Sequence, residues 1–151
     1  MINLEEIVIE VVSENDLDQI YEIEKDNFKF CWSKNYILFN IRLPEFLRKF
    51  YVAKLHNELV GYVVCWLSNE TAHIHNISVK KNYQGFGVGS KILRYLIDKL
   101  KEKSIKTVVL EVRKSNFAAI NLYKKFEFKE VLIKEKFYPD AEDAILMVKQ
   151  L

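Results

Sequence analysis

Runs of apolar and β-branched residues in the first half of the chain predict four strands, because such runs bounded by turn residues are typical of strands. The last three follow one another with only short turns between them, one of which is His56-Asn57-Glu58. Consecutive strands joined by tight turns pair in antiparallel order, so we expect a meander. The predicted strands are Ile7–Val12, Phe50–Leu55, Leu59–Leu67 and Thr71–Val79.

A different spacing lies between the first two of these strands and predicts two helices. Residues 17–28 carry mostly apolar side chains at helical intervals, with Glu24 among them. A second helix is expected to begin at Ser33, because Trp32 before it and Ile37 after it have the spacing of a hydrophobic staple.

The second half of the chain alternates helices with strands. An apolar stripe of period 3.6 from Ile92 to Leu100 predicts a helix that follows Gly89 and ends near Ser104. The resulting order, βααβββαβαββ, predicts a single α/β domain over residues 1–151, with a mixed, mostly antiparallel sheet flanked by helices. The remaining elements are a strand at Thr107–Arg113, a helix at about Asn116–Lys125, and strands at Phe128–Ile133 and Ala144–Val148.

Three of the chain's four glycines, Gly85, Gly87 and Gly89, alternate within five residues just before the helix of the second half. Glycine lets a backbone approach a ligand closely and adopt positive φ. The first N–H groups of a helix lack internal partners and carry partial positive charge. Together these features predict a site for phosphate oxygens. The lysines that flank this site are Lys80, Lys81 and Lys91.

Two familiar nucleotide motifs do not fit this turn. A P-loop ends in Gly-Lys-[Ser/Thr], whereas Ser90 and then Lys91 follow Gly89, and a dinucleotide fingerprint needs a glycine where Ser90 stands. A plain turn without a ligand is the alternative, but one or two glycines suffice for such a turn. The pattern that does stand is Q-x-x-G-x-G, from Gln84 to Gly89.

Composition narrows the classes of function. The chain has 151 residues, of which 50% are hydrophobic. Its net charge of +2 is smaller than expected for a nucleic-acid-binding protein, which usually has a strongly basic face. No apolar run approaches the length of a membrane span, and the N-terminus is acidic and strand-like, unlike a signal peptide. Cys31 and Cys65 fit a reduced, cytoplasmic protein better than a disulfide scaffold. We therefore expect neither a nucleic-acid nor a membrane partner.

The Q-x-x-G-x-G turn resembles the pyrophosphate-binding signature of the GCN5-related N-acetyltransferases, the GNAT superfamily, which hold acetyl-coenzyme A (acetyl-CoA). Further segments resemble, in the same order along the chain, the C-terminal half of the RimI-type enzymes, which acetylate protein N-termini, including alanine N-termini of ribosomal proteins. A weaker resemblance extends to FCWS at Phe30–Ser33. The resembling segments are NISV (Asn76–Val79), YQGFGVG (Tyr83–Gly89), LEVRKSNFAAINLY (Leu110–Tyr123) and FYPDAEDAILM (Phe137–Met147).

This resemblance implies the acyl-CoA N-acyltransferase fold and a metal-free transfer of the acetyl group from acetyl-CoA to a protein's N-terminal α-amine, by direct attack with both substrates bound. It implies Glu111 as general base and Tyr123 as the acid that protonates the departing thiolate. It also implies peptide contacts by Trp32, Phe137 and Tyr138. The residues implied in cofactor binding are Ile77, Ser78 and Val79, through their main chain, together with Gln84, Gly85, Phe86, Gly87, Val88, Gly89, Ser90 and Asn116.

The same residues also admit plainer interpretations. Glu111 lies on the strand face opposite the strand's apolar residues, where a solvated outer position would explain it as well. Tyr123 forms an apolar row with Ile120 and Phe126, which is typical of core packing, and Asn116 can simply cap the helix.

An α-amine has a pKa of about 7.7–8.0, against about 10.4 for lysine, so a modest base suffices for an N-terminus.

Three positions depart from the pattern of the family. Cys31 replaces a proline before Trp32, which makes that entry into the second helix less rigid. Phe137 replaces the first of two tyrosines and loses one hydroxyl group. Glu127 replaces a glycine, and if this position needs positive φ, glutamate costs roughly 1 kcal/mol relative to glycine.

Two histidines and two other functions of the same fold offer alternatives to this interpretation. His73 and His75 alternate on one strand face, but two histidines without a third ligand indicate a metal site only weakly. We expect them beside the sheet or near the substrate groove. A protein of this fold can also acetylate a small amine, such as a polyamine or an antibiotic, or act as a non-catalytic acetyl-CoA-binding module. The identity of the acceptor, for which a ribosomal protein is one candidate, is open at this point.

Overall fold

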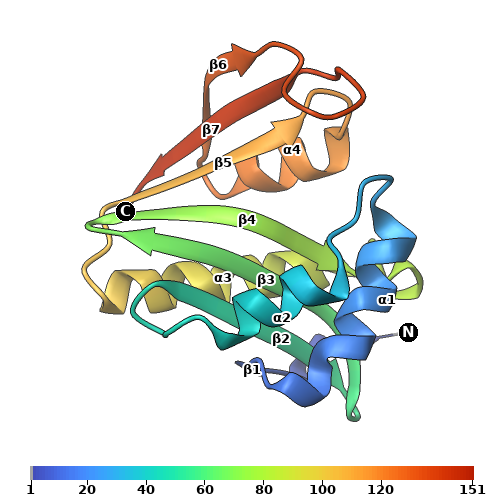
Figure 1. The fold of residues 1–151 in the computed structure, drawn as a ribbon. Coiled ribbons are helices and arrows are strands. Elements are labelled where there is room, and N and C mark those ends of the chain that lie inside the picture. Colours follow the sequence, from blue (N-terminus) through green and yellow to red (C-terminus); the bar gives the residue numbers. More distant parts are fainter. Residues whose placement is uncertain (1) are drawn as a thin grey trace.

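The structure is a computed structural model that describes residues 2–151, and its core is a seven-stranded sheet with helices on both faces (Figure 1). The strands and α-helices follow the predicted order βααβββαβαββ. None of the helices within residues 2–151 is long and apolar enough to cross a membrane. The strands are β1 (Ile7–Val11), β2 (Arg48–Leu55), β3 (Glu58–Ser68), β4 (Thr71–Val79), β5 (Thr107–Arg113), β6 (Lys129–Lys134) and β7 (Ala144–Gln150), and the helices are α1 (Leu17–Asn27), α2 (Lys34–Arg42), α3 (Val88–Glu102) and α4 (Phe117–Lys125).

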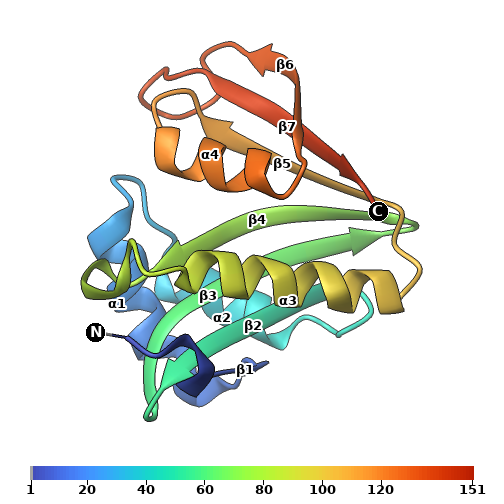
Figure 2. The ribbon, with the colours of Figure 1, turned by 180° about the vertical axis from the view of Figure 1, so that it is seen from behind.

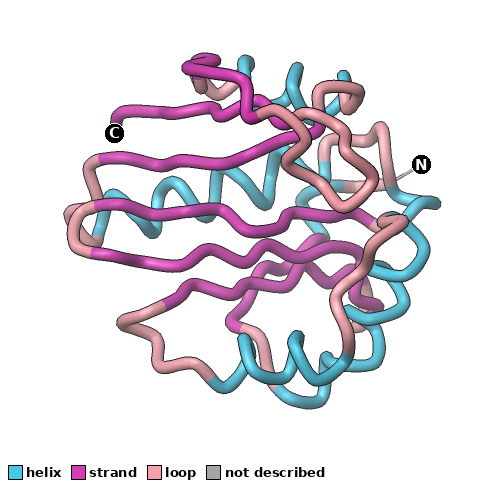
Figure 3. The backbone as a smooth tube through the Cα atoms, turned by 45° about the horizontal axis from the view of Figure 1, so that its top comes forward, coloured by secondary structure: helices cyan, strands magenta, loops and turns pink. Residues whose placement is uncertain are grey.

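The strands lie in the order β1-β2-β3-β4-β5-β7-β6, and Figure 3 shows them side by side. Neighbouring strands pair antiparallel except β4 and β5, which are parallel, so the mixed sheet and the meander β2-β3-β4 are confirmed. A parallel pair needs a long crossover connection, and α3 supplies it.

Helices cover the two faces of the sheet in pairs. α1 and α2 lie in front of the sheet in Figure 1, whereas α3 and α4 lie on the opposite face (Figure 2). Because side chains alternate along a strand, Phe50 and Val52 of β2 pack with α1 and α2, and Tyr51 and Ala53 pack with α3. Burial on both faces explains why β2 appears in the sequence as a continuous apolar run.

Several element ends differ from the prediction by one or two residues. β2 begins at Arg48, which pairs with β3, and β7 extends to Gln150, which pairs with Thr107 of β5. The ends of β1, β3 and β6 shift by one residue. α3 begins at Val88, so Gly89 lies inside its first turn rather than before it.

Glu127 has a φ of +69°, which confirms that this position needs positive φ. It follows the last turn of α4, where the N–H of Phe128 donates to the Tyr123 carbonyl at 3.0 Å and the N–H of Glu127 donates to the Lys124 carbonyl at 2.9 Å. These bonds form a Schellman motif, completed by the contact of the Tyr123 and Phe128 rings, whose centroids are 5.6 Å apart. Glutamate therefore occupies the position at which this motif favours glycine.

Candidate active site

The glycine turn leads directly into α3. Gly85 and Gly87 have φ values of +83° and +92°, which glycine adopts without strain. Gly87 is the N-cap of α3, and no described side chain accepts a hydrogen bond at this cap. A Cβ on Gly85 would meet nothing within 4 Å, so open space lies beside the backbone there. The turn therefore offers unshielded N–H donors with room for an anion.

Other residues of the turn have structural contacts. Phe86 is exposed, the side chain of Val88 is buried, and Ser90 is partly buried in α3. The amide of Gln84 donates to the carbonyl of Val79 at 2.9 Å. This bond ties the turn to the end of β4.

Two of the three lysines near the turn are bound to other parts of the chain. Lys80 pairs with Glu58 at 2.7 Å, and Lys91 donates to the carbonyl of Leu4 at 2.5 Å. Lys81 is exposed. The charge of Lys80 is therefore paired, whereas Lys81 and Lys91 remain cationic beside the backbone N–H groups of the turn.

β4 and β5 stop pairing just before Ile77 to Val79, the residues expected to bind the cofactor through their main chain. Their last paired residues are Ile74 and Leu110, although both strands continue. His75 is an extra residue in β4, because its two neighbours pair with consecutive residues of β3. Such a bulge bends its strand and can end pairing, and Figure 1 shows β5 leaving β4. Asn76–Val79 thus have no strand partner on the β5 side.

Side chains already occupy part of this edge. Asn27, the last residue of α1, donates to the carbonyl of Val79 at 2.8 Å and to the hydroxyl of Ser78 at 2.6 Å. The amide of Gln84 donates to the same carbonyl. Because a carbonyl oxygen has two lone pairs, the Val79 carbonyl is fully used, and the edge offers only its other main-chain groups, such as those of Ile77.

Glu111 is the first residue of β5 beyond its last pair with β4. Its side chain is 11% exposed, with Oε1 at 2.5 Å from Nε2 of His73 and Oε2 at 2.7 Å from Nζ of Lys134. The solvated outer position considered from the sequence is therefore wrong. Burial acts to raise the pKa of Glu111, but the contacts with Lys134 and His73 outweigh it, so the pKa lies below its ordinary value and the carboxylate stays ionised.

The two histidines of β4 lie beside Glu111. The ring centroids of His73 and His75 are 4.5 Å apart, and the Trp66 ring lies 4.4 Å from that of His75. Burial, assisted by His73, lowers the pKa of His75 to about 4, so this ring is neutral near pH 7. Residues 2–151 contain no group of three or more His, Cys, Asp or Glu side chains that could hold a metal ion. The polar partner of His73 is Glu111.

Tyr123 lies on α4, across β5 from Glu111. It is buried in the core that also holds Ile120 and Phe126, so the predicted apolar row is confirmed. Burial, with a smaller contribution from Tyr138, raises the pKa of the Tyr123 hydroxyl, which therefore keeps its proton. No hydrogen bond joins Tyr123 to Glu111 among the described contacts, and the two side chains belong to opposite faces of the strand.

α4 approaches the glycine turn from behind the sheet. A Cβ on Gly89 would lie 3.6 Å from a Leu122 methyl and 3.7 Å from a Val79 methyl, so α3, α4 and the end of β4 meet here. Asn116 caps α4, because its side chain accepts from the N–H of Ala119 at 3.2 Å. The capping role weighed from the sequence is thus confirmed.

A second carboxylate, Glu24 of α1, is buried with 1% exposure. It accepts hydrogen bonds from the Tyr62 hydroxyl, the Asn76 amide and the main-chain N–H of Trp32, the last at 2.8 Å. Burial raises the pKa of Glu24, and the three donors offset this only in part. Glu24 therefore connects α1 to the first residue of the unpaired edge and to the loop before α2.

That loop, residues 28–33, is called the entry loop below. Trp32 is partly buried and packs edge-on against Tyr36, with ring centroids 5.0 Å apart. Ser33 caps α2 by accepting from the N–H of Tyr36 at 3.1 Å, as predicted. Cys31 and Cys65 are both free thiols.

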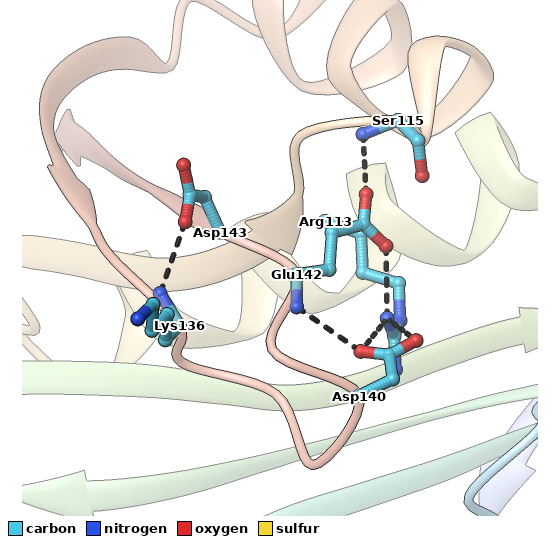
Figure 4. Close-up of polar contacts among 6 residues, drawn as sticks. All are labelled: Arg113, Ser115, Lys136, Asp140, Glu142 and Asp143. Carbon is cyan, nitrogen blue, oxygen red and sulfur yellow. Dashed lines mark hydrogen bonds and ion pairs between the residues drawn. The ribbon is translucent and has the colours of Figure 1, made fainter.

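The loop between β6 and β7 is held by ion pairs to β5 (Figure 4). Arg113 donates to both oxygens of Asp140 at 3.0 Å and to Glu142 at 2.8 Å. Its guanidinium carbon lies 4.1 Å from the centre of the Tyr138 ring. Glu142 also accepts from the N–H of Ser115. Arg113 therefore fixes the loop and one of its aromatic rings together.

The β6–β7 loop carries the aromatic residues expected on the peptide side. Phe137 is exposed and packs edge-on against Tyr138, with centroids 5.1 Å apart. Nζ of Lys134 lies 5.3 Å from the centre of the Phe137 ring. Burial raises the pKa of Tyr138 to about 12, although Arg113 opposes this, so the hydroxyl is neutral. Figure 4 also shows Asp143 accepting from the N–H of Lys136.

The structure places Glu111 where β4 and β5 part, the unpaired β4 edge beyond that point, and the glycine turn at the far end of this edge, next to Val79. Three polar features were not predicted from the sequence. They are the contact of His73 with Glu111, the ion pair of Lys134 with Glu111, and the burial of Glu24. A charged residue inside the apolar stripe of the first helix was the signal for Glu24. No local pattern connects Lys134 with Glu111, because they lie 23 positions apart on strands that do not pair.

The sequence profile of the Acetyltransferase (GNAT) family matches residues 17–128. A putative ribosomal protein bS18-alanine N-acetyltransferase of Bacillus subtilis is 35% identical over 87% of this chain and 87% of its own length. An N-alpha-acetyltransferase of Sulfolobus acidocaldarius is 36% identical over 95% of this chain and 92% of its own length. The crystal structure of the ribosomal-protein-S18-alanine N-acetyltransferase of Escherichia coli has a TM-score of 0.88 at 32% identity, covering 95% of this chain and 93% of that one.

Proposed function

The chain belongs to the Acetyltransferase (GNAT) family, and we propose that it transfers the acetyl group of acetyl-CoA to the α-amine at the N-terminus of a protein. The observation that carries this proposal is that Glu111 is the first residue of β5 after the strands part, opposite the unpaired edge Asn76–Val79. A carboxylate then stands beside main-chain groups that can hold an extended ligand. The relatives named as N-terminal acetyltransferases support the choice of acceptor.

The residues present fit acetyl-CoA, which when bound supplies the thioester carbonyl as electrophile. The open space beside Gly85 and the uncapped start of α3 support phosphate binding by the N–H groups of Gln84–Ser90. The main-chain groups of the β4 edge that remain free, those of Ile77 and the N–H of Val79, would hold the amide-containing arm like an added strand. Asn116, at the start of α4, completes the proposed set.

Glu111 is proposed to take the proton of the acceptor amine. Its lowered pKa makes it a weak base, but an α-amine with a pKa of about 7.7–8.0 is already partly neutral near pH 7. His73, whose Nε2 contacts Oε1 of Glu111, is proposed to hold the carboxylate in position for this transfer. Tyr123 retains its proton because its pKa is raised, and it is proposed to give that proton to the departing thiolate.

The acceptor peptide is proposed to lie between the entry loop, which carries Trp32, and the β6–β7 loop, which carries Phe137 and Tyr138. The pKa of Asp140 in the second loop is lowered mainly by Arg113 and to a small extent by Lys29 of the entry loop, which supports the two loops facing each other. By analogy with the relatives, we propose a ribosomal protein as acceptor and the cytoplasm as location.

The test is an incubation with acetyl-CoA and a library of peptides with free N-termini, read by mass spectrometry. We expect acetylation at the α-amine and none on matched peptides whose N-terminus is blocked but which contain lysine. Turnover of free polyamines without turnover of peptides would instead indicate a small-amine acetyltransferase. Binding of acetyl-CoA without transfer to any amine would indicate a non-catalytic module.

Two variants separate catalysis from binding in the same assay. Tyr123→Phe removes a hydroxyl for which no hydrogen-bond partner is described, so folding should be unaffected while the rate falls roughly tenfold or more. Gly85→Ala adds a Cβ to the open space at a positive φ. We expect it to weaken acetyl-CoA binding with little effect on the rate at saturation. An unchanged rate in Tyr123→Phe would remove this residue from the proposed mechanism.

A further inference from the structure

Both oxygens of Glu111 are occupied before an acceptor arrives. Oε2 lies 2.7 Å from Nζ of Lys134 and Oε1 lies 2.5 Å from Nε2 of His73. The Glu111 side chain is only 11% exposed, so little of it faces solvent between these partners. Each oxygen keeps a second lone pair, but because so little of the side chain is exposed, an incoming ammonium must approach through the space that Lys134 or His73 now covers.

Lys134 is the partner suited to leave. Its ammonium sits on a flexible four-carbon stem, it comes from the edge strand β6, and its side chain is 38% exposed. Its Nζ already lies over the ring of Phe137, on the side where the acceptor is proposed to bind, which gives it a second favourable position. His73, in contrast, packs against the His75 ring, with centroids 4.5 Å apart.

We propose that Lys134 is a displaceable substitute for the acceptor's α-ammonium, which pairs with Glu111 in the free enzyme and yields this position to a free N-terminus. The role rests on the proposed function. Both groups are primary ammonium ions, so the exchange never leaves Glu111 as an unpaired, largely buried charge. An acetylated N-terminus carries no ammonium and cannot displace Lys134, which favours substrate over product.

The other groups near Glu111 do not replace Lys134 as its counter-ion. His75 is neutral near pH 7, and so is Tyr138. Arg113, two residues further along β5, is paired with two carboxylates of the β6–β7 loop. β7 contributes an apolar leucine opposite Glu111. The titratable and charged groups that face Glu111 within residues 2–151 are His73 and His75 from β4, Lys134 from β6 and Tyr138 from the β6–β7 loop.

The first experiment measures binding without turnover. The probe is a short peptide with a free N-terminal alanine, titrated in the presence of CoA into the wild type and Lys134→Met. Because a competing ammonium is removed, we expect the variant to bind this peptide roughly three- to tenfold more tightly. The same peptide with an acetylated N-terminus should bind both proteins equally.

Matched variants separate charge from shape. Lys124→Met removes another lysine, which pairs with Glu130 at 3.5 Å on the neighbouring segment, and should change neither affinity. Lys134→Arg keeps the positive charge and can bind the carboxylate with two donors, so the free-amine peptide should bind no more tightly than to the wild type. An equal gain for free and blocked peptides would mean that Lys134 acts by bulk alone and would overturn the inference.

The second experiment follows the Glu111 carboxyl by carbon NMR in the absence of substrates. Removing the adjacent ammonium should move the titration midpoint of Glu111 to higher pH in Lys134→Met but not in Lys124→Met. An unmoved midpoint, or an unchanged affinity for the free-amine peptide, would overturn the role of Lys134 while leaving N-terminal acetylation intact. A wild type that neither binds nor acetylates this peptide would instead refute the proposed function itself.

Discussion

Two glutamates on the two sides of the separating strands have opposite environments. Glu24, between α1 and β4, is 1% exposed and bonded to neutral donors, so burial dominates and its pKa is raised. Glu111 on β5 is also largely buried, but Lys134 and His73 outweigh burial and its pKa is lowered. The chain thus uses one carboxylate to connect elements and, as proposed, the other to accept a proton.

These two environments show that burial alone does not distinguish a carboxylate that acts as a general base from one with a structural role. A raised carboxyl pKa in a cleft is often a sign of an acid–base role. Glu24 has such a pKa, yet its partners are the hydroxyl, amide and N–H of Tyr62, Asn76 and Trp32, which together fix the β4 edge and the entry loop. Glu111 has a lowered pKa, and one of its partners is on a flexible, partly exposed stem.

The largest expected effect is on the rate of Glu111→Gln. The variant keeps the shape and one oxygen acceptor but cannot take a proton, so we expect kcat/KM for a free-amine peptide to fall about 100-fold near pH 7. The loss should shrink at higher pH, because more of the α-amine is then neutral. Unfolding free energy should change by less than about 1 kcal/mol, since the partners of Glu111 can turn to solvent. A rate within threefold of wild type at pH 7 would contradict the assignment.

Glu24→Gln should show the reverse pattern. One of its two terminal atoms becomes an NH₂ group, so either the Trp32 N–H or the Tyr62 and Asn76 donors lose an acceptor. An unsatisfied buried donor costs about 1–3 kcal/mol, which chemical denaturation should detect as lost stability. Because the entry loop loosens, KM for the peptide should rise more than KM for acetyl-CoA. Wild-type stability in this variant would mean that Glu24 is not a structural connection.

The two glutamates should also give stability an opposite dependence on pH. The lowered pKa of Glu111 contributes stability above the ordinary carboxyl pKa of 4.5, and this is lost as pH falls through its folded value. The raised pKa of Glu24 contributes stability below 4.5, and this is lost as pH rises through its folded value. Urea denaturation from about pH 4 to about pH 7 should therefore show the deficit of Glu24→Gln shrinking and that of Glu111→Gln growing. Deficits that move in the same direction would refute the contrast.

The smallest expected effect lies outside both environments, at Glu127. Glu127→Gly places glycine at the positive-φ position of the Schellman motif and should stabilise the protein by about 1 kcal/mol. Acetylation kinetics should be unchanged, because Glu127 is exposed and lies at the far end of α4 from Asn116. Thermal unfolding measures the gain, and Lys129→Gly on β6 serves as a destabilising control. A loss of stability in Glu127→Gly would show that the glutamate side chain makes a contribution larger than the strain.

Local pattern was sufficient for most of the fold. The strand runs, the short turns and the stripe from Ile92 to Leu100 each reflect a single element, so the element order and the meander were predictable. The glycine turn was predictable for the same reason, because its requirement for positive φ is local. A catalytic role of Glu111 could be inferred only from the family resemblance, because a solvated position explained its place on the strand equally well.

What the sequence did not reveal depends on contacts between distant elements. Lys134 pairs with Glu111 on the other side of β7, and the Asn27 side chain at the end of α1 donates to the Val79 carbonyl at the end of β4. No spacing along the chain predicts either contact. Gly61 is needed because a Cβ there would lie 2.9 Å from the backbone carbonyl oxygen of Ser78 on β4 and 2.8 Å from the Ile92 side chain of α3. That requirement exists only once β4 has paired with β3 and α3 has packed against the sheet.

The central claim is that the glycine turn and the unpaired β4 edge together hold acetyl-CoA beside Glu111. The most direct test is a titration of the isotopically labelled protein with CoA, followed through its backbone amide NMR signals. We predict saturable binding, with the largest changes at the N–H groups of residues 85–90 and of Ile77 and Val79. Absence of saturable binding, or changes confined to the face covered by α1 and α2, would contradict the claim.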